Sequence, residues 1–351
     1  MSEHTASAQT TSTASAPGGP GNGGGGGHGG HGGGHGGGGT KAILAALVAN
    51  VGIAIAKFIA FLVTGASSML AESIHSVADS GNQVLLLVGG KRAQRAATPQ
   101  HPFGFGRDRY IYSFIVAIVL FSVGGLFAIY EGVHKLQHPG ELTSPAWAIG
   151  VLLVAIGLES FSLRTAVKET NAVRQPGESY WGFIRHARAP ELPVVLLEDT
   201  GALLGLVLAL LGVGLSTVTG NGVFDGLGTV AIGVLLVVIA VILAIETKSL
   251  LIGESATPDA QRRIVAALEA GGASVIHMRT QHLGPEELLV AAKIAVRHDD
   301  TAADVARAID EAEARIREAV PIARVIYLEP DIRRPGSVPD PAAAQGSTPP
   351  G

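Results

Sequence analysis

Two side chains in one apolar segment of the chain could bind a metal ion together. His75 and Asp79 lie four residues apart in the stretch SSMLAESIHSVADSGNQVLLLVGG, so a helix would place them on one face. An imidazole nitrogen and a carboxylate oxygen are both ligands for divalent transition metals. Glu72 and Asn82 each lie three residues from one member of the pair, and we expect them to orient the ligands or to take part in proton coupling.

A second apolar segment supplies carboxylates. The stretch PVVLLEDTGALLGLVLALLG carries Glu198 and Asp199, which point about 100° apart if the stretch is helical. Val195, four residues before Asp199, cannot bind a metal. The predicted site is therefore His75, Asp79 and Asp199, with Glu198 as the fourth candidate ligand. Three carboxylates move the preference from Zn(II) towards Fe(II) or Mn(II). The alternative explanation is a polar seam between helices in the first segment and a wet helix end in the second.

Three further side chains are weaker candidates. Glu159 lies inside an apolar stretch and could serve either proton coupling or a helix–helix hydrogen bond. His101, in the loop TPQHPFGFGRDR, could hold a second metal on the cytoplasmic side, and His282 could do so in the C-terminal region. For both histidines we prefer the explanation that the imidazole is solvated.

The composition indicates a membrane protein. Of 351 residues, 47% are hydrophobic and 15% are charged, whereas a soluble domain carries about 25% charged residues. No cysteine is present, which excludes disulfides and thiolate metal sites. A net charge of −4 argues against a nucleic-acid partner. The first 40 residues have no basic segment followed by an apolar one, so we expect no cleaved signal peptide.

Six apolar stretches follow one another along the chain, each close to the roughly 20 residues that cross a hydrocarbon core of about 30 Å. None alternates as the strands of a membrane barrel do, so we expect six transmembrane helices. They are residues 42–64, 68–90, 111–133, 146–166, 193–216 and 223–247.

The connections between these stretches predict an orientation. Basic residues gather at 91–109 and at 164–188, whereas Lys135 is alone on the opposite side. By the positive-inside rule both termini are cytoplasmic. We expect the membrane to be the cell (plasma) membrane.

The composition divides the chain into four parts. We expect a disordered Gly/His-rich tail at 1–40, the transmembrane domain at 41–250, a cytosolic domain at 251–332 and a disordered tail at 333–351. Periodicity within the cytosolic part predicts the order α-β-β-α-β, a small α+β domain, with Thr301 capping the second helix. The elements are expected at 257–271, 274–282, 287–297, 301–318 and 325–328.

Together these pieces resemble the cation diffusion facilitator family. The motif AESIHSVADSGNQ, the loop HPFGFG and the acidic pair of the fifth stretch carry the resemblance, which covers residues 41–330. The strings GLFAIYEGVHKLQHP and PELPVVLLEDTGALLG are similar to the zinc-transporter-nine-like branch. Many members place two ligands four residues apart on each of spans 2 and 5, and a second histidine in the loop. Here Val195 and Phe105 stand at those positions.

The resemblance implies a function. Members are dimeric metal/proton antiporters whose cytosolic domain resembles a metallochaperone. We therefore expect a divalent-metal efflux transporter and not an enzyme, with metal ions, protons, the lipid bilayer and a second copy as partners. Zinc is the first choice of substrate, with iron, manganese or cobalt as the others. The alternative is a membrane metal sensor or assembly protein that does not transport.

Overall fold

A computed structural model describes residues 38–140 and 143–332, with side chains from Asn50 onward. The two tails that we expect to be disordered lie almost entirely outside these residues. Helices make up the first part of the described chain. They are α1 (Gly38–Thr64), α2 (Ser67–Ala93), α3 (Asp108–Val119), the π-helical η1 (Leu120–Leu126), α4 (Phe127–Gln137), α5 (Pro145–Val173), α6 (Tyr180–His186), α7 (Glu191–Thr219) and α8 (Val223–Ile252).

Four helical stretches in the described part of the chain are long and apolar enough to cross a membrane. They are Asp108–Gln137 (α3, η1 and α4 in one run), Pro145–Val173, Glu191–Thr219 and Val223–Ile252. Helix α1 adds a shorter apolar segment, Asn50–Thr64. Helix α2 has 27 residues, but polar side chains replace too many of its apolar positions. The prediction of six membrane-spanning helices is thus supported for four.

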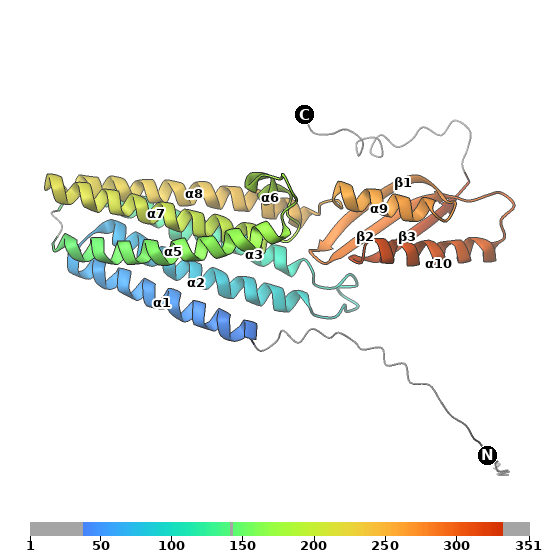
Figure 1. Cartoon of the computed structure of the whole chain (residues 1–351), viewed down its shortest axis with the longest axis horizontal. Coiled ribbons are helices and arrows are strands. Elements are labelled where there is room, and N and C mark those ends of the chain that lie inside the picture. Colours follow the sequence, from blue (N-terminus) through green and yellow to red (C-terminus); the bar gives the residue numbers. More distant parts are fainter. Residues whose placement is uncertain (1–37, 141–142, 333–351) are drawn as a thin grey trace, which may run out of the picture. The chain divides into compact units, whose positions relative to one another are not determined.

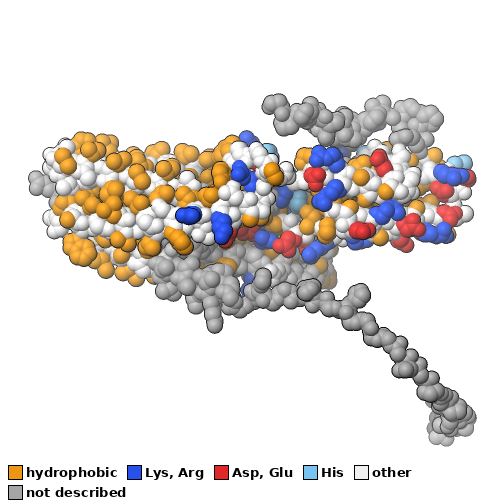
Figure 2. Space-filling view, in the orientation of Figure 1, with side chains coloured by type: hydrophobic (Ala, Val, Ile, Leu, Met, Phe, Trp, Pro, Cys, Tyr) orange, Lys and Arg blue, Asp and Glu red, His pale blue; other side chains and the backbone are white. Residues whose placement is uncertain are grey.

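Helix α2 contacts several other helices of this part. It packs against α3, η1, α7 and α8, and these helices run side by side (Figure 1). Large hydrophobic side chains such as Phe161, Leu211 and Val218 point outward and are exposed. Figure 2 shows hydrophobic side chains spread over α5, α7 and α8, whereas charged ones gather over the C-terminal helices. An apolar exterior of this kind is suited to lipid.

Glycines let α8 approach the helix formed by η1 and α4. A Cβ atom on Gly132 would lie 2.7 Å from the backbone nitrogen of Val230, and one on Gly233 would lie 2.7 Å from that of Ile129. Real side chains do not tolerate such distances, so only glycine fits at these positions. Small residues serve the same purpose in many membrane helix pairs.

A buried carboxylate fixes the start of α2. Asp225 of α8 accepts hydrogen bonds from the backbone N–H groups of Ser67 (2.7 Å) and Ser68 (3.3 Å), and from both serine hydroxyls. The first N–H groups of a helix have no partner within the helix, and a negative charge there is stabilising. Asp225 therefore ties the beginning of α2 to α8.

The C-terminal elements follow in the order α9, β1, β2, α10, β3. They are α9 (Pro258–Glu269), β1 (Ser274–Gly284), β2 (Glu287–Ala295), α10 (Ala302–Ala319) and β3 (Ala323–Asp331). Strand β2 is central, antiparallel to β1 and parallel to β3, and α10 makes the crossover that a parallel pair requires. The predicted cap is confirmed, because the Thr301 hydroxyl accepts from the Asp304 N–H and the Asp304 carboxylate accepts in return.

Alternation along β2 places the core of this part on one face of the sheet. Leu288, Val290, Ala292 and Ile294 are buried, and the residues between them are only partly covered. Both α9 and α10 pack on that face, because they also contact each other. The result is a two-layer α/β sandwich (Figure 1).

Candidate metal centre

Helix α2 brings His75 and Asp79 together as their spacing predicts. His75 Nε2 lies 3.4 Å from Asp79 Oδ2, and the two side chains are 1% and 17% exposed. No residue in the described ranges hydrogen-bonds to either imidazole nitrogen or to Asp79 Oδ1. Buried polar atoms nearly always have a partner, since leaving one without costs about 1–3 kcal/mol. The pair thus presents free lone pairs in a buried position.

The π-helical segment η1 passes directly beside His75. A Cβ atom on Gly124 would lie 3.9 Å from His75 Nδ1, so this glycine backbone lines the imidazole. Single π-helical turns within α-helices are frequent at functional sites. The apolar run of residues 111–133 predicts one regular helix and does not reveal the π-helical turn. The adjacent glycines Gly124 and Gly125 are the only local signal for it.

The two acidic neighbours on α7 face different helices. Glu198 is buried, and its Oε1 accepts a hydrogen bond from Asn82 Nδ2 of α2 at 2.7 Å. Asp199 is half-buried, and its Oδ2 accepts from Ser162 Oγ of α5 at 2.9 Å. Asn82 therefore positions Glu198. The structure places Glu198 against α2, and Asp199 towards α5.

A track of polar atoms runs along α2. Glu72 Oε1 and Asn82 Oδ1 are buried and make no hydrogen bond within the described chain, as is also true of the His75/Asp79 atoms between them. Ten residues of helix correspond to about 15 Å. Among the described residues, no three His, Asp or Glu side chains lie close enough together to hold one ion. The geometry is therefore a half-site on α2, with the α7 carboxylates within electrostatic range of Asp79.

Lys57 is a charged neighbour of the pair that the motif spacing does not predict. Its Nζ lies 3.0 Å from Glu72 Oε2 and donates to Ser76 Oγ at 2.8 Å, and it is fully buried. The signal in the sequence was a single lysine inside the apolar run of residues 42–64. Asp225 was missed as well, since nothing local links it to α2.

The weaker candidates lie in three different parts of the fold. Glu159 is half-buried on α5 and interacts electrostatically with Lys57 and Asp79. His101 is exposed in the loop before α3, where its ring packs on Phe105 with 4.6 Å between centroids. Its backbone pairs with Thr98 in a tight turn. His101 is thus exposed, in line with the solvated imidazole that we preferred.

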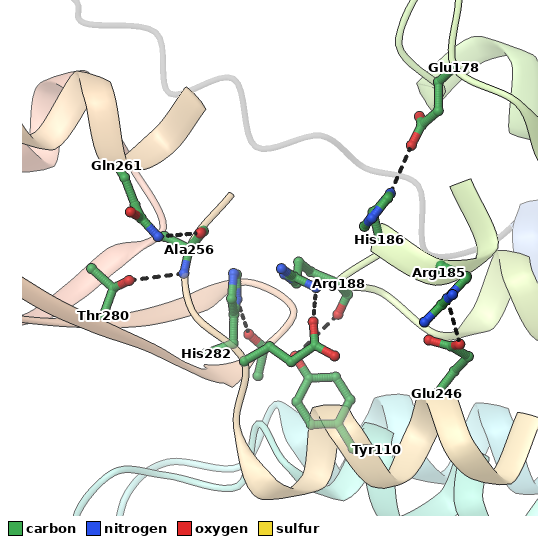
Figure 3. Close-up of polar contacts among 12 residues, drawn as sticks. Tyr110, Glu178, Arg185, His186, Arg188, Glu246, Ala256, Gln261, Thr280 and His282 are labelled. Carbon is green, nitrogen blue, oxygen red and sulfur yellow. Dashed lines mark hydrogen bonds and ion pairs between the residues drawn. The ribbon is translucent and has the colours of Figure 1, made fainter. Parts of the chain in front are cut away.

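The same preference is wrong for His282, which is only 2% exposed. Its Nδ1 donates to the carbonyl of Gly284 at 3.2 Å, and its backbone N–H donates to the carbonyl of Glu254. Figure 3 shows the imidazole near Arg188, whose carbonyl accepts from the Tyr110 hydroxyl and whose guanidinium pairs with Glu254. Burial lowers the pKa of His282, so the ring is neutral near pH 7. These bonds give it a structural role at the end of β1.

Comparison with known proteins identifies what the helical part is similar to. Residues 43–252 match the family model of the cation efflux transmembrane domain. The chain is 36% identical over 214 residues to the human proton-coupled zinc antiporter SLC30A9, mitochondrial, which is 61% of this chain and 38% of that protein. It is 28% identical over 261 residues to metal tolerance protein C4 of Arabidopsis thaliana (72% and 56%). It is 25% identical over 275 residues to magnetosome protein MamB of Magnetospira sp. (75% and 87%).

The aligned region spans well under half the length of the human relative. The predicted plasma membrane receives no support, because the human relative's name places that protein in mitochondria. The apolar helices and the family match show an integral membrane protein.

Proposed function

The chain belongs to the cation efflux transmembrane family, and on that premise we propose that it transports a divalent transition-metal ion, zinc first, in exchange for protons. One observation carries the proposal: within the described residues, buried polar atoms of His75, Asp79 and Asn82 on α2 have no hydrogen-bond partner. Such atoms are costly in a membrane helix unless they bind something. The names of relatives that include a zinc antiporter support the choice of substrate.

The proposed site combines His75 and Asp79 of α2 with Glu198 and Asp199 of α7. Binding requires a neutral imidazole and ionised carboxylates, so a metal ion displaces protons from the site. When the site faces the other side of the membrane, protons compete the metal off, and an inward proton gradient drives efflux. Closing the site requires the α7 carboxylates to move onto the α2 pair, which fits alternating access around a central site.

Several finer points belong to the same proposal. The charged connections support six spans with both termini in the cytoplasm, with α1 and α2 proposed as the two spans beyond the four long apolar helices. A homodimer follows from the family resemblance and can be tested by light scattering in detergent. Iron, manganese and cobalt remain candidate substrates on ligand chemistry alone, because three of the four candidate ligands are carboxylates. The prediction that the chain is not an enzyme agrees with its family.

Zinc flux into vesicles tests the proposal. Purified full-length protein would be reconstituted with an internal zinc-sensitive dye and an imposed pH gradient. We expect gradient-dependent flux that is lost in His75→Ala and in Asp79→Ala. His134→Ala and Asp259→Ala, which remove exposed residues of the same types, should transport normally. Normal flux in both site variants would show that the site is misassigned.

The alternative of a metal-binding protein that does not transport has one observation in its favour. No three potential ligands in the described residues gather around one point. Such a protein would bind zinc through His75 and Asp79 but give no flux in response to a pH gradient. The same vesicles therefore separate the two functions, and adding iron, manganese and cobalt in competition identifies the preferred ion.

A further inference from the structure

A buried cation lies next to the proposed site and is not one of its proposed ligands. Lys57 is on α1, and both it and its ion-pair partner Glu72 have side chains that are 0% exposed. A charged group at this depth is expensive even when paired. An apolar pair of similar volume would pack as well, so the two charges call for a function.

The geometry connects this pair to His75. Glu72 precedes His75 by three residues on α2, and positions three apart are neighbours on a helix surface. Lys57 Nζ also donates to Ser76 Oγ at 2.8 Å, and Ser76 adjoins His75 in the chain. Lys57 interacts electrostatically with both His75 and Asp79.

The pair also leaves one oxygen free. Glu72 Oε2 pairs with Lys57, but Glu72 Oε1 has no hydrogen-bond partner among the described residues. This oxygen faces α7, where a Cβ atom on Gly205 would lie only 2.7 Å from it. Glycine at this position therefore makes room for the carboxylate between α2 and α7. Glu72 is held at a defined position beside the candidate ligands, with its charge balanced from α1.

We propose that Lys57 is a tethered counter-charge which, through Glu72, sets how tightly the His75/Asp79 site holds a divalent cation. This inference rests on the proposed function. The ammonium repels a divalent ion at the site, and the Glu72 carboxylate attracts it. Because the environment is buried, each effect is stronger than it would be in water. The intact pair is neutral and keeps the affinity moderate.

A moderate affinity suits transport. A site that conducts an ion must bind it well enough to capture it and weakly enough to release it. Without Lys57, the site would carry one more uncompensated negative charge, and release would become slow. Lys57 thus positions Glu72 and lowers the affinity of the site for the metal ion, and it does not ligate the metal.

Charge variants of the full-length protein test this with opposite signs. In zinc-dye competition on purified protein, we expect Lys57→Met to lower the Kd for zinc at least about tenfold, and Glu72→Gln to raise it about tenfold. The double variant restores the charge balance and should lie within about threefold of wild type. Lys57→Arg keeps the charge and should also stay near wild type. Lys168→Met, which removes an exposed lysine of α5, is the matched control.

Transport kinetics give a second readout that a purely structural role would not move. Lys57→Met should lower both KM and the maximal rate, since tighter binding slows release. An unchanged Kd in Lys57→Met would overturn the inference. If that variant does not fold, Glu72→Gln and the double variant decide: wild-type or tighter binding by Glu72→Gln, or no recovery in the double variant, would overturn it.

The result is separable from the proposed function. Suppose that His75→Ala and Asp79→Ala lose zinc flux while the charge variants keep the wild-type zinc affinity. This result would contradict only the role of Lys57. Normal flux in His75→Ala and Asp79→Ala would sink the proposed site, whatever the charge variants do.

Discussion

Helix α2 contains two buried polar regions that differ in how well the protein satisfies them. At its start, the Asp225 carboxylate accepts hydrogen bonds from two backbone N–H groups and two serine hydroxyls. Near its middle, both nitrogens of His75 and one oxygen of Asp79 have no such partner in the described chain. Within one helix, satisfied polar groups hold the fold together, and unsatisfied ones are available to a ligand.

Removing the satisfied group should have the largest effect on stability. Asp225→Ala leaves two buried N–H groups and the Ser68 hydroxyl without their acceptor, and leaves the Ser67 hydroxyl with Thr229 alone. We therefore expect the free energy of unfolding to fall by about 3 kcal/mol or more. Thermal unfolding in detergent measures this, with the exposed Asp259→Ala as control. Zinc affinity of the protein that remains folded should be unchanged. A variant as stable as wild type would remove the distinction between the two regions.

Removing an unsatisfied group should have the opposite profile. Asp79→Asn deletes a proposed ligand, and we expect zinc flux to fall about a hundredfold or more. Stability should stay the same or rise, because a buried carboxylate with an unpartnered oxygen is replaced by a neutral amide. Flux in vesicles and unfolding temperature are measured on the same preparation. A large loss of stability with normal flux would instead make Asp79 a structural residue.

The two carboxylates of α7 can be separated through the groups that hold them. Asn82→Ala removes the hydrogen bond to Glu198, and Ser162→Ala removes the one to Asp199. If Glu198 is the ligand that faces α2, Asn82→Ala should weaken zinc binding about tenfold and Ser162→Ala should have little effect. Zinc titration of both variants gives the answer. The reverse order would assign the ligand to Asp199.

The smallest effect concerns the other buried histidine. Burial lowers the pKa of His282, so the unfolded chain binds the proton more readily than the folded one. Stability should therefore fall as the pH drops below the ordinary value of 6.5. Unfolding temperatures are compared at about pH 7 and about pH 5.5, on either side of that pKa. The drop between the two should be smaller in His282→Asn than in wild type, by no more than about 3 °C. Zinc should not alter this acid sensitivity, because His282, in contrast to His75, is not a proposed ligand. A zinc-dependent shift would contradict the structural role of His282.

The spacing of His75 and Asp79 was enough to predict their contact, because positions four apart on a helix always meet. The cap at Thr301 was predictable for the same local reason. Contacts between distant parts of the chain could not be predicted from local spacing. Asp225 is 158 residues from Ser67, and no sequence pattern near either residue indicates their hydrogen bond. The orientation of Glu198 and Asp199 also depends on how α7 is rotated against α2 and α5.

The ion pair of Lys57 was not predictable for a different reason. The sequence shows this lysine within an apolar stretch. Its ion pair, however, depends on Glu72 lying opposite it on α2, which is set by the packing of the two helices. The burial of His282 likewise follows from its neighbours in the fold, among them Gly284 and Glu254. A sequence pattern gives the face of a helix or strand, whereas the partner of each buried charge is set by tertiary packing.

The bonds between Asp225 and the start of α2 also make that end a pivot. With a rise of 1.5 Å per residue, His75 lies about 12 Å from the fixed end at Ser67, and Asn82 lies about 22 Å from it. A tilt of α2 about this end therefore moves Asn82 nearly twice as far as His75. A displacement of about 1 Å at the imidazole becomes about 2 Å at the amide, which is enough to break its 2.7 Å bond to Glu198. A tilt of α2 about its anchored end would thus part Asn82 from Glu198 of α7 while His75 moves only about half as far.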